Sequence, residues 1–203
     1  MIRTGRDRAL NVKSVLITGT GTDVGKTIVC RHLASSLQAR GVNVITQKWV
    51  QTGSEHDDDI RGHMLEPLPA WSKVQGLDHL RTPYRLKHPS SPHLAAALEG
   101  EGIDIHSIED AHAHLCRHFD LVLVEGSGGV LVPLTSTMLL ADLAARLNMA
   151  AVIVAVNELG CINHTLLTIE ALRTRGITIL GVIFNRMSKD GDETILSDNM
   201  RVI

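Results

Sequence analysis

The residues best suited to chemistry lie in Val15–Cys30, VLITGTGTDVGKTIVC, where an apolar run leads into a glycine-bearing loop and then a helical pattern. A strand, loop and helix in this order direct backbone N–H groups and a helix N-terminus at an anion. Lys26 adds a positive charge, and Thr27 offers a hydroxyl group to a magnesium ion. We interpret the stretch as a phosphate-binding loop.

The spacing of this loop departs from the usual pattern G-x-x-x-x-G-K-[ST]. The position five residues before Gly25 is Thr20, and the first glycine of the loop is Gly19, one residue earlier. The loop is therefore one residue longer than the pattern, although it keeps the glycines, the lysine and the threonine that phosphate binding needs.

Acidic residues that could share a magnesium ion with Thr27 follow two other segments. Glu125 ends the apolar run 119–126 and precedes small residues, so it is placed like the acid that faces the phosphates in other nucleotide-binding sheets. A second carboxylate is expected from one of three residues in the acidic run EHDDDI. Asp59 is the first choice because it is nearest the following helix, Asp58 is the second, and Asp57 stays open.

Lys48 lies near the end of the expected strand at residues 42–50, where QKWVQTG turns out of the sheet. Burying an ammonium group there is costly unless an anion meets it. We interpret Lys48 as a charge clamp on a transferring phosphoryl group or its acceptor. Thr52 follows and could hydrogen-bond a small polar substrate. By contrast, His112, His114 and His118 have helical spacing without matching ligands, and we expect them on a solvated helix face.

Short apolar runs alternate with helical patterns along the chain, which predicts an α/β fold. The expected strands cover residues 14–19, 42–50, 119–126, 150–157 and 177–185. The expected helices cover residues 26–41, 107–118, 138–148, 163–175 and 193–200. This order favours a doubly wound, mostly parallel sheet flanked by helices, in which ligands bind beyond the carboxyl ends of the strands.

Length, net charge and cysteine spacing limit the classes of protein to which this chain could belong. The 203 residues suit one domain, and the formal net charge of −2 gives no indication of nucleic acid or an anionic membrane as partner. We expect a loose leader over residues 1–13 and a single domain over residues 14–203. No secretory signal or membrane-spanning run is visible, and the three cysteines lack paired spacing, so we expect reduced thiols and a cytoplasmic location.

The sequence resembles the dethiobiotin synthetase family. The phosphate loop of that family, G-x-x-x-x-x-G-K-T, is also one residue longer than the usual pattern. Six motifs fall in order over about Ser14–Met187: GTGTDVGKT, KWVQTG, HPSSPHLAA, EGSGGVLVPL, LGCINHTLLT and NRM. The resemblance implies a P-loop NTPase-like fold and an ATP- and Mg²⁺-dependent ligase of biotin biosynthesis. Its substrates would be 7,8-diaminononanoate and CO₂, joined through a carbamate and a carbamic-phosphoric anhydride with release of ADP and phosphate.

The resemblance also implies roles for individual residues. Lys26, Lys48 and Thr22 would be catalytic, and Thr27, Glu125 and an aspartate of the acidic run, Asp59 first, would hold Mg²⁺. The nucleotide would contact Gly21, Thr22, Asp23, Val24, Gly25, Lys26, Thr27 and Asn185. The substrate would contact Thr52, Gly128, Gly160, Cys161 and Asn163. The family site lies at a homodimer interface, so Asn163 would act across it.

Two features depart from the family pattern. Trp49 replaces the usual proline after Lys48, where an indole could alter the path of the loop or shield the lysine. The sequence ends at Ile203, whereas relatives continue with a strand and a loop that contacts the adenine, so the resemblance does not extend to those base contacts.

Other classes of P-loop protein fit the residues less well. A switch ATPase of the ParA/MinD type is the main alternative, but it needs a second lysine near the head of the loop, and Thr20–Val24 contains none. An amidotransfer ligase of the cobyrinate-synthase type would need a glutamine-hydrolysing domain, for which the chain has no room. A nucleotide-binding module without catalysis is disfavoured by the presence of Lys26, Lys48 and Glu125.

Overall fold

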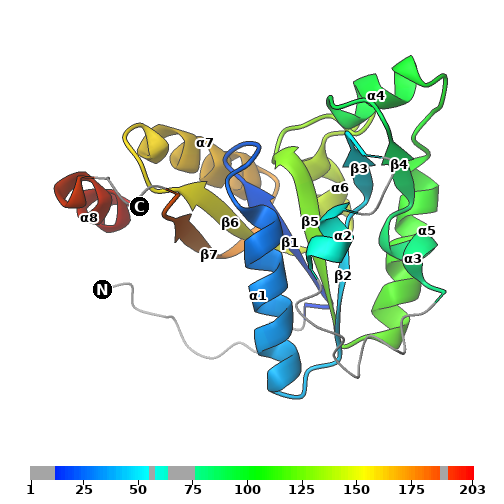
Figure 1. Ribbon diagram of the computed structural model, residues 1–203, viewed down its shortest axis with the longest axis horizontal. Coiled ribbons are helices and arrows are strands. Elements are labelled where there is room, and N and C mark those ends of the chain that lie inside the picture. Colours follow the sequence, from blue (N-terminus) through cyan, green and yellow to red (C-terminus); the bar gives the residue numbers. More distant parts are fainter. Residues whose placement is uncertain (1–11, 55–57, 64–75, 188–191) are drawn as a thin grey trace.

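The structure is a computed structural model that describes residues 12–54, 58–63, 76–187 and 192–203. Five parallel strands form the main sheet in the order β2-β5-β1-β6-β7 (Figure 1). Their bounds are β1 Ser14–Gly19, β2 Val44–Gln47, β5 Leu121–Gly129, β6 Ala150–Val156 and β7 Thr178–Asn185. The parallel α/β sheet predicted from the alternating pattern is confirmed.

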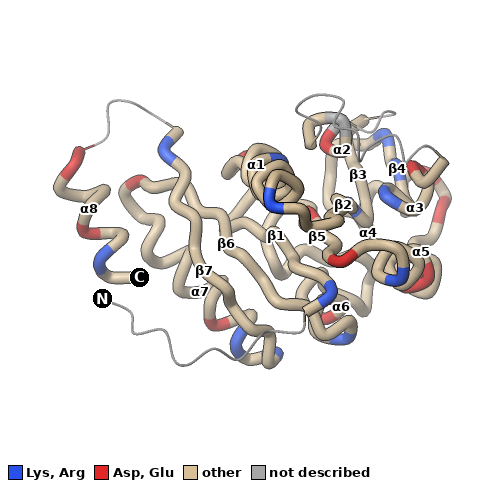
Figure 2. Tube along the Cα trace, turned by 90° about the horizontal axis from the view of Figure 1, so that it is seen from below, with Lys and Arg blue, Asp and Glu red and all other residues tan. Residues whose placement is uncertain are grey.

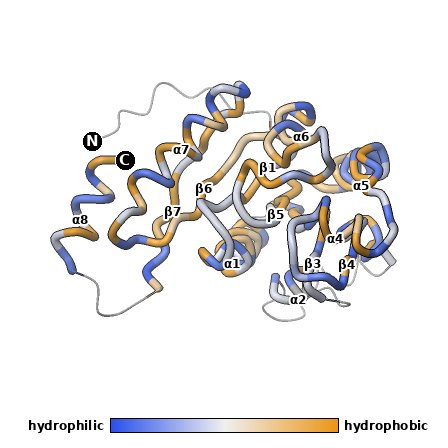
Figure 3. The backbone as a smooth tube through the Cα atoms, turned by 90° about the horizontal axis from the view of Figure 1, so that it is seen from above, coloured by the Kyte–Doolittle hydropathy of each residue, from blue (hydrophilic) through white to orange (hydrophobic). Residues whose placement is uncertain are grey.

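Helices cover both faces of this sheet. Figure 2 shows α1 (Lys26–Ala39) on one side of the strands, with α6 (Leu140–Arg146) and α7 (Cys161–Thr174) on the other, and the strands mostly uncharged. The remaining longer helices are α4 (Pro92–Leu98), α5 (Ile105–His118) and α8 (Glu193–Val202). Hydrophobic and hydrophilic segments alternate along α5 and α8, as expected for helices with one apolar face (Figure 3).

The alternation of side chains along β1 explains why the core has two parts. Val15 and Ile17 pack in the cluster that contains Val29 and Cys30 of α1. Leu16, between them, packs in the larger cluster on the other face, with residues of α5, α6 and α7. Successive side chains of a strand point to opposite faces, and a parallel strand buried on both faces is apolar at every position.

The second expected strand, residues 42–50, is wrong in its extent. The main sheet keeps only β2, and the chain leaves it at Lys48 and Trp49 before forming β3 (Val50–Thr52). β3 pairs with β4 (Tyr84–Leu86) in a separate two-stranded parallel sheet. Both pieces are buried and both mix apolar with polar residues, so the sequence pattern alone does not reveal the break.

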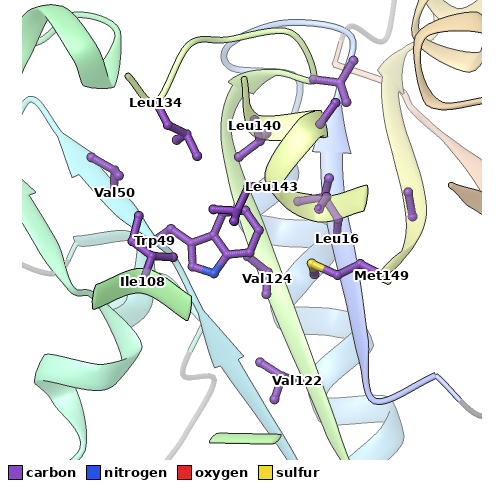
Figure 4. Close-up of a cluster of buried hydrophobic side chains, with 14 of the residues drawn as sticks. Leu16, Trp49, Val50, Ile108, Val122, Val124, Leu134, Leu140, Leu143 and Met149 are labelled. Carbon is purple, nitrogen blue, oxygen red and sulfur yellow. The ribbon is translucent and has the colours of Figure 1, made fainter. Parts of the chain in front are cut away.

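Trp49 points into the core and does not shield Lys48. Its side chain is 1% exposed, and Figure 4 shows the indole among Ile108, Val124 and Leu143. The indole N–H donates to Oε1 of Gln47 at 3.1 Å, so the one polar atom of the ring is satisfied. The expectation that the indole shields the lysine is therefore wrong.

The expectation that His112 lies on a solvated helix face is wrong. Nδ1 of His112 lies 2.8 Å from Oε1 of Gln47, and the ring is buried rather than solvated. Burial lowers the pKa of His112 to about 4. His118 is exposed and His114 is half-buried on α5, and their rings stack with centroids 4.4 Å apart.

The N-terminal segment is described from Val12 onward, and the C-terminal end forms the helix α8. Residues 1–11 of the expected leader lie outside the described residues, whereas Val12 packs against the cluster under α1. At the other end, Asn199 of α8 donates to Oδ1 of Asn157 at 2.8 Å, which attaches the helix to the end of β6. The assignment of residues 14–203 to one domain stays a prediction.

Two further expectations concern the whole chain. The structure shows Cys30, Cys116 and Cys161 as free thiols. Among the described residues, none of the helices has the length and apolar character needed to cross a membrane.

The remaining described elements are two short helices, α2 (Asp58–Gly62) and α3 (Asp78–Arg81). α3 contacts β2 and α5. Its Arg81 is 1% exposed and donates through Nη2 to Oγ1 of Thr46 at 2.9 Å. α2 lies beside α1 and carries residues of the site described next.

Candidate functional site

A cavity of about 750 Å³ opens beside the phosphate loop, at the carboxyl ends of β1, β2 and β5. This is where a parallel sheet binds its ligands. It brings together ten residues that the sequence analysis assigned to the site: Thr22, Asp23, Gly25, Lys26, Thr27, Lys48, Thr52, Asp59, Glu125 and Gly128.

The loop between β1 and α1 has a backbone that requires glycine. Gly25 has φ 93° and precedes the first turn of α1. A Cβ atom on Gly19 would lie 2.6 Å from Cγ2 of Val24, so the longer loop still folds tightly against itself. The loop therefore presents the start of α1 to the cavity, as an anion site requires.

Lys26 folds back over this loop. Its Nζ donates to the carbonyl oxygen of Gly21 at 2.8 Å. Burial lowers the pKa of Lys26, and the nearby charge of Glu125 partly opposes that shift. An anionic phosphate would replace the neutral carbonyl as a partner and favour the charged lysine.

Asn185 supports the loop from the end of β7. Its Nδ2 donates to the carbonyl oxygen of Val24 at 3.1 Å, and a Cβ atom on Gly25 would come within 2.1 Å of the same nitrogen. The expected contact of Asn185 with the nucleotide base stays a prediction, and the structure shows this additional contact with the loop.

Three oxygen-bearing side chains meet at the first turn of α1. Oγ1 of Thr27 lies 3.0 Å from Oε1 of Glu125 and 3.3 Å from Oδ1 of Asp59. A hydroxyl and two carboxylates are hard oxygen donors, and Mg²⁺ commonly takes one or two carboxylates and completes its shell with phosphate oxygens and water. The donor set therefore fits Mg²⁺.

Within the described ranges, no group of three or more His, Cys, Asp or Glu side chains is arranged to hold a metal ion. The Asp57 alternative lies outside the described residues, and the side chain of Asp58 is not described. Asp59 is thus the aspartate of the acidic run that the structure places beside Thr27.

Lys48 contacts the same two carboxylates as Thr27. Its ammonium nitrogen lies 3.1 Å from Oε1 of Glu125 and forms an ion pair with Oδ2 of Asp59. Burial alone would lower the pKa of Lys48, but the charges of Glu125 and Asp59 raise this pKa above its usual value. The lysine is therefore held charged beside the phosphate loop.

His63 is a site residue that the sequence analysis missed. Its Nε2 lies 2.5 Å from Oε2 of Glu125, and its side chain is fully buried. Burial alone would raise the pKa of Glu125. The hydrogen bond to His63 and the charge of Lys48 outweigh burial and lower this pKa to about 2. The signal was available, because His63 follows Asp59 by four residues, a spacing that puts both side chains on one face of a helix.

Three predicted substrate residues lie elsewhere in the chain. Gly160, Cys161 and Asn163 form the start of α7, after β6, and do not line the cavity. Gly160 has φ 93°, and Asn163 is exposed. Their role as carboxylate-binding residues stays a prediction that depends on a second copy of the chain.

Comparison with known families and relatives gives a consistent result. A family model described as an AAA domain matches residues 13–203. The ATP-dependent dethiobiotin synthetase BioD of Chlorobaculum tepidum is 38% identical over 199 residues, which are 98% of this chain and 82% of that protein.

Among solved structures, two share the fold at low identity. The kinase domain of the Escherichia coli tyrosine kinase ETK is 18% identical with a TM-score of 0.56, over 91% of this chain and 71% of that one. A structure of pNOB8 ParA bound to nonspecific DNA is 16% identical with a TM-score of 0.56, over 94% of this chain and 73% of that one. These likenesses support the P-loop NTPase-like fold and carry no functional argument.

Proposed function

Because the chain belongs to the family of ATP-dependent dethiobiotin synthetases, ligases of biotin biosynthesis, we propose that it closes the ureido ring of dethiobiotin from 7,8-diaminononanoate and CO₂. One amine adds to CO₂ and loses a proton, giving a carbamate. A carbamate oxygen attacks the γ-phosphorus of ATP and ADP leaves, giving a carbamic-phosphoric anhydride. The second amine attacks the carbamoyl carbon, the carbon–oxygen bond to phosphate breaks, and phosphate leaves with loss of a proton.

The observation that carries this proposal is the position of Lys48. Phosphate binding already has Lys26, yet a second buried lysine is held at Asp59 and Glu125, in the same cavity as the loop. A fixed cation at that place would stabilise the negative charge shared by the carbamate and the transferring phosphoryl group. A site that only holds a nucleotide would have no need of it.

The other residues fit the two halves of the reaction. Lys26 and the backbone N–H groups at the start of α1 would bind the β- and γ-phosphates. Thr27, Asp59 and Glu125 would hold Mg²⁺, which when bound would neutralise charge that develops on the phosphate oxygens. Thr22 and Thr52 line the cavity and would orient the amine and carbamate end of the substrate.

The far end of the substrate would need a second copy of the chain. Gly160 and Asn163 are exposed at the start of α7, and the adjacent Leu159 is 82% exposed. In a homodimer, the N-terminus of this helix would donate backbone N–H groups to the carboxylate of 7,8-diaminononanoate in the partner's cavity. The homodimer and the cytoplasmic location are proposals on the same footing.

The alternative of a ParA/MinD-type switch ATPase receives no specific support. The structural likeness to ParA shows the fold alone, and the loop residues Thr20–Val24 contain no lysine. A switch ATPase would also hydrolyse ATP without a small-molecule acceptor, which gives a direct way to distinguish the two.

The decisive experiment measures phosphate release by the full chain with ATP and Mg²⁺, with 7,8-diaminononanoate and bicarbonate added singly and together. We expect turnover only when both are present, with dethiobiotin formed in equal amount to phosphate. Release of phosphate at the same rate without the diamine would contradict the proposal and favour the switch ATPase. Other nucleotides in place of ATP would show the base preference.

A further inference from the structure

The two carboxylate oxygens of Glu125 have different partners. Oε1 faces Thr27 at 3.0 Å and Lys48 at 3.1 Å, on the side of the phosphate loop. Oε2 faces away from them and meets Nε2 of His63 at 2.5 Å. An ionised carboxylate only accepts hydrogen bonds, so Nε2 of His63 must carry the proton in this contact.

His63 is itself fixed by the short helix that carries Asp59. Its backbone N–H donates to the carbonyl oxygen of Asp59 at 3.0 Å, in the last turn of α2. The preceding residue, Gly62, approaches α1 so closely that a Cβ atom on it would lie 2.9 Å from Cγ2 of Thr27. α2 therefore delivers both Asp59 and His63 to the first turn of α1.

We propose that His63 is a positioning residue for the magnesium site, which holds Glu125 with Oε1 directed at the metal and Oε2 directed away from it. The inference rests on the proposed function to the extent that Thr27, Asp59 and Glu125 bind Mg²⁺ with the nucleotide. His63 does not line the cavity, so it would touch neither the nucleotide nor the diamine. It acts through the orientation of one carboxylate.

The physical reason lies in the burial of Glu125, whose side chain is 2% exposed. Without His63, Oε2 would be a buried charged oxygen without a donor, which is costly. The carboxylate would then be free to rotate and bring Oε2 to Thr27 or Lys48, the donors that now face Oε1, and Oε1 would no longer be held for a metal. Hydrogen-bond partners of metal ligands typically contribute ~10- to 100-fold to metal affinity or activity.

The test uses two variants of His63 in the full chain. His63→Leu removes the donor at similar volume, and His63→Gln keeps an N–H at about the reach of Nε2. His112→Leu is the matched control, because His112 is another buried histidine, bonded to Gln47 and outside the cavity lining. The probe is Mn²⁺ in the presence of ADP, followed by the electron paramagnetic resonance of free Mn²⁺, with ADP binding measured separately without metal.

For His63→Leu we expect the Kd of Mn²⁺ to rise about 10-fold or more, with metal-free ADP binding unchanged. His63→Gln should stay within about 3-fold of the unsubstituted protein, and His112→Leu should leave the Kd unchanged. In turnover assays, raising the Mg²⁺ concentration should restore most of the rate of His63→Leu, which a general loss of folded protein would not allow.

Several results would overturn the inference and leave the proposed function standing. They are an unchanged Mn²⁺ Kd in His63→Leu, an equal loss in His112→Leu, or a loss in His63→Gln as large as in His63→Leu. If instead the unsubstituted protein bound Mn²⁺ no better with ADP than without it, the proposed magnesium site and the inference built on it would both fail. Diamine-dependent turnover would still be tested independently.

Discussion

The ammonium group of Lys48 lies 3.1 Å from Oε1 of Glu125, and both side chains are buried. The pair follows from strand register, since Gln47, the last residue of β2, pairs with Val124 of β5, and Lys48 and Glu125 are the next residues of the chain. Opposite charges thus lie side by side where β2 ends and β5 continues, at the edge of the sheet where ligands bind. Each charge offsets part of the cost of burying the other.

Replacing Lys48 should separate nucleotide binding from chemistry. In Lys48→Ala we expect the rate of diamine-dependent phosphate release to fall at least ~10²-fold while the Kd for nucleotide stays nearly unchanged, because the lost charge acts in the transition state. Calorimetry of nucleotide binding beside steady-state kinetics gives the two quantities. Lys13→Ala, an exposed lysine before β1, is the control, and unchanged turnover in Lys48→Ala would exclude the role given to this residue.

Two adjacent aspartates offer a matched comparison at the magnesium site. Asp59→Asn and Asp58→Asn remove the same charge one residue apart, but the structure places Asp59 at 3.3 Å from Thr27. We expect Asp59→Asn to raise the Mg²⁺ concentration for half-maximal rate about 10-fold or more and Asp58→Asn to change it little. A titration of rate against Mg²⁺ measures both, and the reverse order would assign the ligand to Asp58.

The buried indole of Trp49 should contribute strongly to stability and little to chemistry. Trp49→Ala should lower the free energy of unfolding by about 3–5 kcal/mol, because it leaves a cavity in the core. Trp49→Phe keeps most of the apolar contact and should cost less, about 1–2 kcal/mol, from the lost N–H donor to Gln47. Urea denaturation monitored by circular dichroism measures both, and a loss below about 1 kcal/mol in Trp49→Ala would contradict the buried position.

His112 should make the protein less stable in mild acid. Its pKa is lowered to about 4 in the folded protein, against an ordinary value of 6.5. Between these two pH values, His112 is protonated in the unfolded chain but neutral in the folded protein. The free energy of unfolding is therefore highest above pH 6.5, the unfolded pKa, and falls as the pH drops toward the folded pKa of about 4. The expected loss between about pH 7 and about pH 5 is roughly 2 kcal/mol.

Urea denaturation of the unsubstituted protein and of His112→Gln at both pH values tests this assignment. The variant cannot titrate in this range, so its free energy of unfolding should fall by less than that of the unsubstituted protein. Glu125 does not interfere, because its pKa is about 2 in the folded protein and 4.5 ordinarily, so its effect on stability falls below pH 5. An equal fall in both proteins would show that another group carries the pH dependence.

Much of the fold could be predicted because local signals are strong where the strands are buried on both faces. The strand at residues 14–19 was predicted with its observed bounds, and those at 150–157 and 177–185 are within one residue of β6 and β7. The strand at 42–50 was wrong in extent because β2 and β3 are both largely buried and no change of composition separates them. The switch of the chain to a second sheet at Lys48 and Trp49 is made by pairing with β4, far along the sequence.

For the site, the sequence was sufficient to identify the phosphate loop, its lysine and threonine, and the acid Glu125 within β5. These residues lie in a strand, follow one or open a helix, and their position relative to the backbone is a local property. Only the tertiary structure decided which side chains meet across the cavity. It placed Asp59 beside Thr27, set Lys48 against Glu125, turned Trp49 into the core, and brought His63 to the second oxygen of Glu125. The three site contacts join residues 32 to 77 positions apart, and depend on strand register and helix packing that no local pattern encodes.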